Sequence, residues 1–270
     1  MPELASVARP RGGEAVLGIS FFNGSLAQAC DRAAGGGLLT APSGPGLACD
    51  LRREPAYRRA LQHSDLVLTD SAFMVVLWWV RTGKRLPRNS GLAFLRIWMN
   101  RELMRRPGAA FWVLPDEAES RHTQAWLQAR GFPADPAAFH TARVYGSGEI
   151  EDQILLQRIE EYRPEIIYIG IGGGVQERLG LYLRDSLGYR PLILCLGAAI
   201  AFMTGAQVQI APWVDRCGLG WLWRIVSSPS RYAGRYLRAV RLAWMIFRFG
   251  DCAPPLATLP ESRTASCSTP

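Results

Sequence analysis

The sequence predicts an α/β fold, doubly wound around a mainly parallel sheet, with a basic helical appendage at the C-terminal end. Short apolar runs alternate with helical patterns over most of the 270 residues, as they do in β-α-β units. The stretch 216–250 then differs in kind, because it holds seven arginines and no acidic residue. With 49% hydrophobic residues, a chain of this length buries a large core without disulfides or a structural metal.

Apolar patterning assigns the individual elements. The predicted strands are 16–21, 37–40, 65–69, 110–114, 166–170 and 192–196, and the predicted helices are 25–34, 54–62, 72–81 and 117–130. These elements define a domain over 14–206, which the basic, aromatic-rich appendage follows over 207–250. Residues 1–13 and 251–270 are predicted to be flexible tails, since the second is rich in Pro, Ser and Thr and lacks periodicity.

Charge and cysteine content narrow the class of protein. The net charge is +8, and Lys84 is the only lysine among 31 basic residues. Arginine suits bidentate phosphate contacts, although a genome-wide preference for arginine codons explains the bias as well. Six cysteines without a CxxC pair, and three histidines, match neither a zinc site nor a disulfide framework, so a reduced, cytoplasmic setting fits best. The N-terminus shows no signal peptide, and the longest apolar stretch, 192–204, is too short to span a bilayer.

Ligands of such sheets bind outside the carboxyl ends of the strands, so the residues that follow each predicted strand are candidates for a site. They are Thr40, Asp70, 115–116, 170–177 and Gly197. Asp70 separates an apolar strand from an apolar helix. It is either the N-cap of that helix or a catalytic base within reach of a substrate hydroxyl.

The segment IIYIGIGGGVQERLG gives the sharpest local signal. Its three consecutive glycines follow a buried strand and run into a predicted helix at Val175, which lets main-chain N–H groups approach a diphosphate. The spacing matches neither GxGxxG nor GxxxxGK[ST], so a nicotinamide-dependent oxidoreductase has only the glycines in its favour. A glycine-rich packing turn is the plainer alternative. Arg88, in a loop bounded by Pro and Gly, either binds a phosphate or lies on the surface.

The stretch 216–250 interleaves its arginines with Trp, Tyr and Phe. Arg231, Arg235, Arg238 and Arg241 are spaced for one face of a helix. A basic face beside aromatic rings suits an anionic membrane surface or a pyrophosphate. A solvated surface is the alternative, and nucleic-acid binding lacks a recognition motif.

Taken in order, these pieces resemble the WecG/TagA/CpsF family of bacterial glycosyltransferases over about residues 15–248. The matching motifs are LLT at 38–40, LTD at 68–70, RNSG at 88–91, GGGVQER at 172–178, GAAIAFMTG at 197–205, APW at 211–213, GLGWLWR at 218–224 and RYAGRYL at 231–237. Each motif is weak alone, whereas their order and spacing together are specific.

The resemblance implies a Rossmann-like catalytic domain and an appendage that faces the membrane. Members transfer a sugar with inversion from a nucleotide sugar, typically UDP-linked, to a polyprenyl-diphosphate-linked saccharide, and no obligatory metal or other cofactor is expected. They act at the inner face of the cell membrane in making exopolysaccharides and cell-wall polymers. The implied partners are therefore a UDP-sugar, a lipid-linked saccharide and an anionic membrane surface, without nucleic acid.

The same resemblance assigns roles to single residues. Asp70 corresponds to the general base, Thr40 to the acceptor side, and Arg88 to a diphosphate contact. The residues expected to bind the donor are Gly172, Gly173, Gly174, Val175, Gln176, Glu177 and Gly197. Those expected to face the lipid diphosphate and the membrane are Arg224, Arg231, Arg235 and Arg238.

Some positions depart from the family pattern. Ala41, Pro42 and Ser43 follow Thr40 where Pro-Asn is usual, and Ala201 and Gly220 replace acids. These departures keep a second hypothesis open, in which the chain binds a nucleotide sugar without catalysis inside a polysaccharide assembly complex. The apolar helix over 73–80 also fits an interface of a homo-oligomer as readily as a core.

Overall fold

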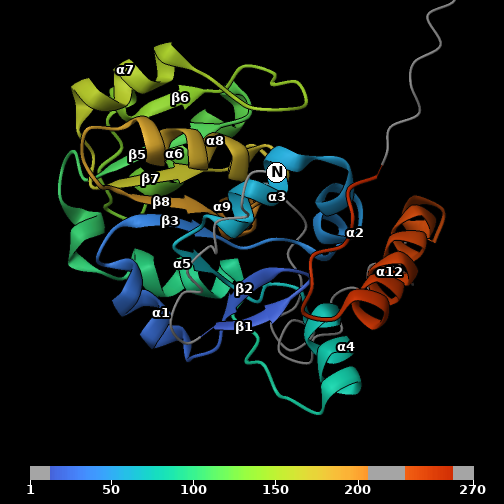
Figure 1. Ribbon diagram of the computed structural model, residues 1–270. Helices are drawn as coiled ribbons and strands as arrows, with labels where there is room; N and C mark the ends of the chain where they lie inside the picture. Colours follow the sequence, from blue (N-terminus) through green and yellow to red (C-terminus); the bar gives the residue numbers. More distant parts are fainter. Residues whose placement is uncertain (1–12, 206–228, 258–270) are drawn as a thin grey trace, which may run out of the picture.

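The computed structural model describes residues 13–205 and 229–257. Its centre is a six-stranded sheet in the order β4-β3-β8-β7-β5-β6, in which every neighbouring pair is parallel. The strands are β3 (Gly37–Thr40), β4 (Leu66–Val67), β5 (Ala110–Leu114), β6 (Phe139–Thr141), β7 (Ile166–Ile169) and β8 (Leu192–Cys195). Helices flank the sheet on both sides (Figure 1), which confirms the predicted Rossmann-like α/β fold.

Helices that pack on the two faces of the sheet bury two separate cores. One core holds α1 (Leu26–Ala33), α5 (Gly91–Met99), α6 (Glu117–Gln128) and α9 (Ala199–Thr204) around Trp98, Trp112 and Tyr168. The other holds α3 (Pro55–Gln62), α7 (Gln153–Tyr162) and α8 (Gln176–Ser186). The strands β3, β7 and β8 are buried on both faces, which is why their sequences read as continuous apolar runs.

The predicted strand 16–21 is wrong. The segment folds as a hairpin of β1 (Gly13–Val16) and β2 (Ile19–Phe22), which form an antiparallel sheet of their own. Leu17 and Gly18 make the two-residue turn with φ of 54° and 76°. Positive φ at both central residues matches the right-handed twist of a tight hairpin, whereas the apolar pattern alone concealed the reversal. Five further α-helices and strands, α2 (Gly44–Arg53), α5, β6, α7 and α9, were absent from the sequence prediction.

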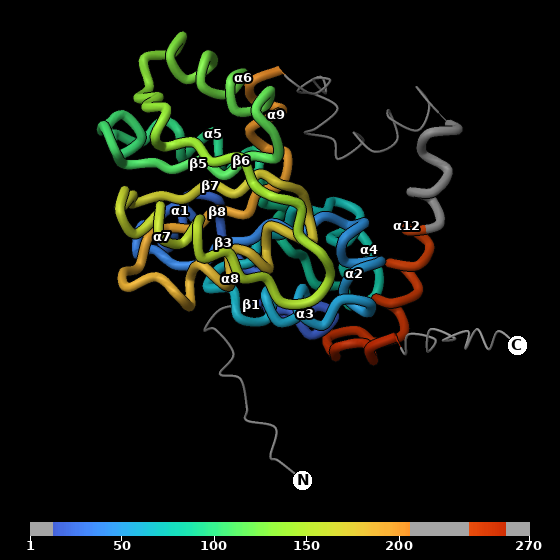
Figure 2. The backbone as a smooth tube through the Cα atoms, turned by 90° about the horizontal axis from the view of Figure 1, so that it is seen from above, coloured from blue at the N-terminus to red at the C-terminus, as the bar shows by residue number. Residues whose placement is uncertain are grey.

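A third core joins the appendage to the domain. Leu242, Met245 and Ile246 of α12 (Pro229–Phe249) are buried against α2 and α4 (Ala72–Thr82). Figure 2 shows these three helices side by side. The end of the predicted appendage is therefore a helix seated on the domain, while residues 206–228 lie outside the described part.

Residues 251–257 run back over the domain. Gly18 N donates to the Asp251 carbonyl oxygen at 2.9 Å, and Ala257 N donates to that of Arg52 at 2.7 Å. This part of the predicted flexible tail is thus held by hydrogen bonds, and 258–270 lie outside the described residues. Among the described helices, none has the length and apolar character needed to cross a membrane.

Candidate functional site

The carboxyl ends of β3, β4, β7 and β8 meet at one edge of the sheet, and several predicted site residues lie there. Gly91 N donates to Asp70 Oδ1 at 2.9 Å. Gly91 itself sits so close to the loop after β8 that a methyl group on it would lie 3.3 Å from the Leu196 carbonyl oxygen. The next residue, Gly197, donates its N–H to Gln176 Oε1 at 3.1 Å. Close contacts therefore connect Asp70 with the glycine turn.

Asp70 does not cap the helix that follows it, so that alternative is wrong. Ser71 is the N-cap of α4, and its Oγ accepts the Met74 N–H at 3.2 Å. The half-buried Asp70 carboxylate instead accepts the N–H of the first residue of α5, whose N-cap is Ser90. The carboxylate thus lies at the positive end of the α5 dipole, where an anion is stabilised.

The loop that contains Arg88 is tied to the residue before Asp70. Thr69 is fully buried; its Oγ1 donates to the Pro87 carbonyl oxygen and accepts the Asn89 N–H at 3.0 Å. Asn89 Nδ2 in turn donates to the Gly24 carbonyl oxygen at 2.9 Å. Arg88 stands between these two fixed residues with its side chain exposed. The structure therefore brings the Arg88 loop next to Asp70, and the predicted contact of Arg88 with a diphosphate stays a prediction.

Thr40 lies at the end of β3 but away from the exposed edge. Its side chain has no exposed surface, and its Oγ1 donates to Ser64 Oγ at 3.2 Å. Ser64 Oγ donates to the Ala60 carbonyl oxygen at 2.7 Å. The Thr40 hydroxyl thus ties β3 to the end of α3, and this position offers no surface to an acceptor. Its predicted role with the acceptor stays a prediction.

The glycine turn presents main-chain N–H groups at the start of α8. Gly172 and Gly173 are exposed, and within the described part of the chain their N–H groups have no hydrogen-bond acceptor. Gly172 and Gly174 have φ of 105° and 88°, a conformation that side chains rarely adopt. Free N–H groups before a helix are suited to bind an anion, and binding of the donor diphosphate at this turn stays a prediction.

Gln176 and Glu177 lie beneath this turn. Each side chain is only 1% exposed. Glu177 Oε2 accepts the Gly174 N–H at 2.7 Å, and its Oε1 accepts from Gln176 Nε2 at 3.1 Å. Burial raises the pKa of the Glu177 carboxyl to about 7, and the charge of Asp50 adds to this effect. Both side chains hold the turn in place, so a direct contact with the donor stays a prediction.

Two residues at the turn were missed by the sequence analysis. Arg178 is buried; its Nε donates to the Gly174 carbonyl oxygen at 2.7 Å, and its Nη1 reaches the carbonyl oxygens of Gly146 and Gly148. Asp50 of α2 faces the turn, since a methyl group on Gly174 would lie 3.3 Å from its Oδ2. Arg178 could have been found inside GGGVQER, whereas no motif signalled Asp50.

Arg238 brings the appendage towards the same turn. Burial raises the pKa of the Asp50 carboxyl, and the nearby charge of Arg238 opposes that shift. The Arg238 side chain is exposed. Arg231 and Arg235 lie in α12, but their side chains are outside the described part, as is the whole of Arg224 with the motifs 211–213 and 218–224.

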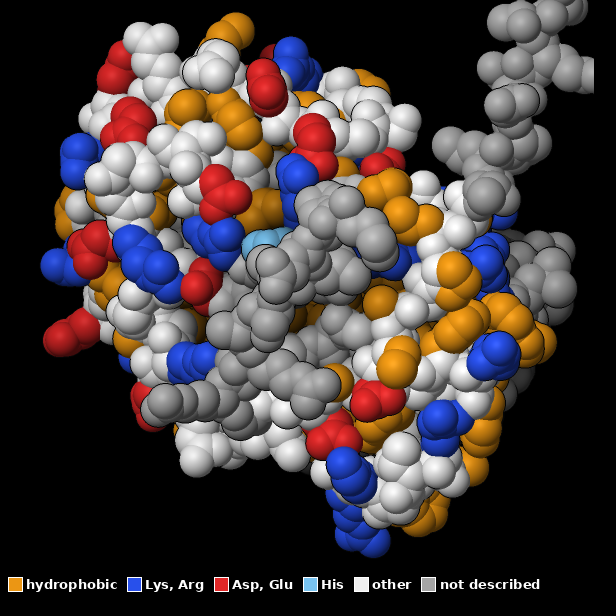
Figure 3. Space-filling model, in the orientation of Figure 1, with side chains coloured by type: hydrophobic (Ala, Val, Ile, Leu, Met, Phe, Trp, Pro, Cys, Tyr) orange, Lys and Arg blue, Asp and Glu red, His pale blue; other side chains and the backbone are white. Residues whose placement is uncertain are grey.

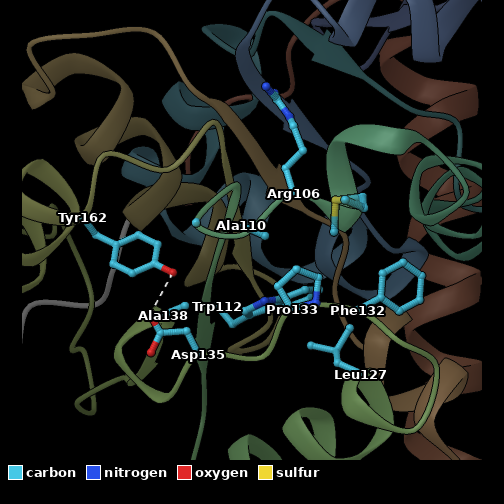
Figure 4. A pocket seen from close by; sticks show the side chains of 11 residues that line it. Arg106, Ala110, Trp112, Leu127, Phe132, Pro133, Asp135, Ala138 and Tyr162 are labelled. Carbon is cyan, nitrogen blue, oxygen red and sulfur yellow. Dashed lines mark hydrogen bonds between the residues drawn. The ribbon is translucent and has the colours of Figure 1, made fainter.

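A pocket at the amino ends of β5 and β6 lies on the opposite edge of the sheet (Figure 4). Tyr162 donates its hydroxyl to Asp135 Oδ2 there at 3.4 Å. With a volume of about 10 Å³, the pocket holds at most one water molecule.

Among the described residues, no three His, Cys, Asp or Glu side chains gather as a metal site would require. The expectation of a metal-independent reaction stays a prediction.

The comparison with known families shows which family the chain belongs to. The model of the glycosyl transferase WecG/TagA/CpsF family matches residues 14–250. The chain belongs to this family. The match confirms the resemblance found in the motifs, and it includes Asp70, the glycine turn and α12. No curated protein matches the chain. For a glycosyltransferase, an activated sugar donor and a sugar acceptor must meet at one site. Within the described part of the chain, the motifs LTD, RNSG and GGGVQER lie together at the carboxyl edge.

Proposed function

We propose that this chain is an inverting glycosyltransferase that moves a sugar from a UDP-sugar to a polyprenyl-diphosphate-linked saccharide. The product would extend an exopolysaccharide or a cell-wall polymer. One observation supports the proposal above the others: Asp70, fixed by the Gly91 N–H, stands at the sheet edge that also carries the glycine turn.

Asp70 fits the role of general base. The acceptor hydroxyl transfers its proton to the Asp70 carboxylate as its oxygen attacks the anomeric carbon from the face opposite UDP. The bond between that carbon and the UDP oxygen breaks, and its electron pair leaves with UDP. A single displacement of this kind inverts the anomeric configuration.

The departing UDP gains negative charge, which fixed donors in the site must stabilise. The exposed N–H groups of Gly172 and Gly173, at the start of α8, are suitable for this purpose. Arg88, in its anchored loop, and Arg238, which approaches the turn over Asp50, add positive charge from two sides.

The protein would act at the inner face of the cell membrane as a peripheral protein. Its acceptor carries a lipid, so the reacting sugar lies near the headgroups. A net charge of +8 attracts the chain to an anionic leaflet.

The test is a transfer assay with a panel of UDP- and GDP-sugars and a polyprenyl-diphosphate saccharide dispersed in detergent. We expect one UDP-sugar to give a product whose new linkage has the inverted configuration by NMR. Transfer should persist in EDTA. A UDP-sugar that binds, measured by a shift in melting temperature, but is never transferred would favour the non-catalytic alternative. A retained configuration would exclude the single displacement.

A further inference from the structure

Exposed apolar side chains gather on two helices that pack against each other. Among the described residues, most of the large apolar side chains on the surface belong to α4 and α12. They are Val76, Trp79 and Val80 on α4, and Val240, Trp244 and Phe247 on α12. The two helices lie side by side in both ribbon views (Figures 1 and 2). Grouped apolar surface of this kind marks an interaction site, whereas single apolar residues elsewhere need no explanation.

The outer face of α12 is apolar, whereas Arg238 lies on the side that packs on the domain. Val240, Trp244 and Phe247 follow i, i+4, i+7 spacing and are about half exposed or more. Arg238 has the same spacing to Leu242 and Met245, which are buried, and its charge acts on Asp50. Of the predicted arginine face, Arg238 therefore lies on the side of α12 that packs on the domain, near Asp50, and the apolar stripe lies on another side.

Basic residues flank the two apolar stripes without acidic neighbours on either helix. Neither α4 nor α12 contains Asp or Glu. The basic residues at or beside them are Arg52, Arg81, Arg85, Arg241 and Arg248, while Lys84 is paired with Glu14 at 2.9 Å. Arg81 donates to the Phe247 carbonyl oxygen, which locks the ends of the two helices together, and the Arg52 guanidinium lies 5.8 Å from the Trp244 ring centre. In Figure 3, blue and orange side chains alternate over α12 and α4.

We propose that the outer faces of α4 and α12 together form the surface that docks on an anionic lipid bilayer. Trp79, Val80, Val240, Trp244 and Phe247 enter the headgroup boundary, and the flanking basic residues contact anionic headgroups. This inference builds on the proposed function, because a lipid-linked acceptor requires the enzyme to sit on the membrane. It extends to α4 a role in membrane binding that the motifs predicted only for the C-terminal arginines.

A second copy of the chain is the competing occupant, and charge argues against it. In a two-fold dimer the same patch lies on both sides of the interface. Arg81, Arg85 and Arg248 would then approach a partner surface that is equally basic and has no acid on these helices to meet them. An anionic bilayer can bury the apolar side chains at its headgroup boundary and attract the basic residues to its headgroups.

The experiment compares vesicle binding by substituted full-length chains. The double variant Val80→Glu with Val240→Glu changes one side chain on each helix, and both positions are well exposed at 59% and 69%. Ile154→Glu on α7 is the matched control, because Ile154 is 72% exposed. With vesicles of phosphatidylcholine and phosphatidylglycerol, we expect co-sedimentation of the double variant to fall about tenfold or more while the control binds as the parent does. Equal binding of the double variant would overturn the proposal.

Further measurements separate this surface from the proposed reaction. Transfer to a detergent-dispersed acceptor should be the same in the double variant and the parent. If the parent transfers sugar but does not bind vesicles, the proposed docking surface is wrong and the proposed reaction is unaffected. If the parent binds vesicles through this surface but transfers no sugar, the proposed reaction alone is wrong. A parent dimer that the double variant converts to a monomer in sedimentation velocity would assign the surface to self-association. If the melting temperature of the double variant falls, Trp79→Ser with Phe247→Ser gives the same test without added charge.

Discussion

The N–H of Gly91 donates to Oδ1 of Asp70 at 2.9 Å, so the first turn of α5 fixes the carboxylate that follows β4. The donor is a main-chain group, and its position is set by the fold. It is further constrained by the close approach of Gly91 to Ala41 and Leu196, since a methyl group there would lie 3.2 Å from Ala41 Cβ. For the proposed role of Asp70 as general base, a carboxylate that the backbone orients before the substrate arrives lowers the cost of reaching the transition state.

Replacing Asp70 by Asn should separate folding from catalysis. The amide oxygen of Asn still accepts the Gly91 N–H, so the melting temperature should stay close to that of the parent. The amide cannot take a proton, so kcat should fall about 10²- to 10⁴-fold, while binding of the UDP-sugar persists.

Asp135→Asn is the matched control for this change. The Asp135 carboxylate also accepts a main-chain N–H, from Ala137 at 2.9 Å, but it lies at the opposite edge of the sheet. Its replacement should leave kcat unchanged. If Asp70→Asn keeps full activity, Asp70 is not the base.

Gly173→Ala tests whether the glycine turn receives the donor. Gly173 has no positive φ, and a methyl group on it meets only Ser43 Oγ, at 3.9 Å. The substitution should therefore leave stability intact but place a methyl group where the diphosphate approaches. We expect the Kd of the UDP-sugar, measured by calorimetry, to rise about tenfold or more, which corresponds to about 1.4 kcal/mol.

Gly146→Ala provides the comparison, because a methyl group there meets nothing within 4 Å and Gly146 also lacks a positive φ. It should bind the donor as the parent does. Equal affinity in both alanine variants would mean that the donor diphosphate lies elsewhere.

The parts of the fold that sequence could predict are those with a strong local signal. The buried strands β3, β5, β7 and β8 form continuous apolar runs, and their predicted ranges agree with the structure to within one residue. The hairpin escaped because its turn, Leu17-Gly18, lies inside an apolar stretch. Helix α2 escaped because its start, GPG, reads as a loop, although Ser43 caps it.

For the site, sequence predicted which residues meet but not what each side chain does. The rule that ligands bind at the carboxyl ends of parallel strands placed Asp70 and the glycine turn at one edge, and the structure shows the contacts that join them. Arg88 was assigned to the site only by the family resemblance, and its loop is tied to Thr69. Hydrogen-bond partners depend on tertiary packing, so the burial of Thr40 and Gln176 could not be read from the chain. Which face of α12 packs on the domain could not be predicted from the sequence, because it is known only from the burial of Leu242.

Thr69→Val should loosen the Arg88 loop without altering its charge. Valine has the shape of threonine but neither donates to the Pro87 carbonyl oxygen nor accepts the Asn89 N–H. Leaving these buried groups unpaired should cost about 1–3 kcal/mol of unfolding free energy. We also expect a higher KM for the donor, because Arg88 loses its fixed position.

Thr82→Val is the control, since the Thr82 hydroxyl makes a comparable bond to the Trp78 carbonyl oxygen, at 2.7 Å, on an exposed turn of α4. Urea unfolding and steady-state kinetics on both variants check the prediction. A normal KM in Thr69→Val would show that the loop needs no anchor beside Asp70.

Glu177→Gln should change how stability depends on pH. The pKa of the Glu177 carboxyl is about 7 in the folded chain, above its ordinary value of 4.5, mainly because the group is buried. Between these values the folded state holds a proton that the unfolded state has released. The stability from this group is therefore fully present at low pH and is lost as pH rises to about 7, by up to about 3 kcal/mol.

Glutamine stays neutral and still accepts the Gly174 N–H, so its unfolding free energy should lack this decline. The difference between the parent and Glu177→Gln, from urea unfolding between about pH 5 and pH 8, isolates the contribution of this carboxyl, because both chains share every other titrating group. Parallel curves would mean that Glu177 is already ionised at low pH. In that case the glycine turn is held by a charged carboxylate, and its N–H groups would meet a diphosphate beside a negative charge.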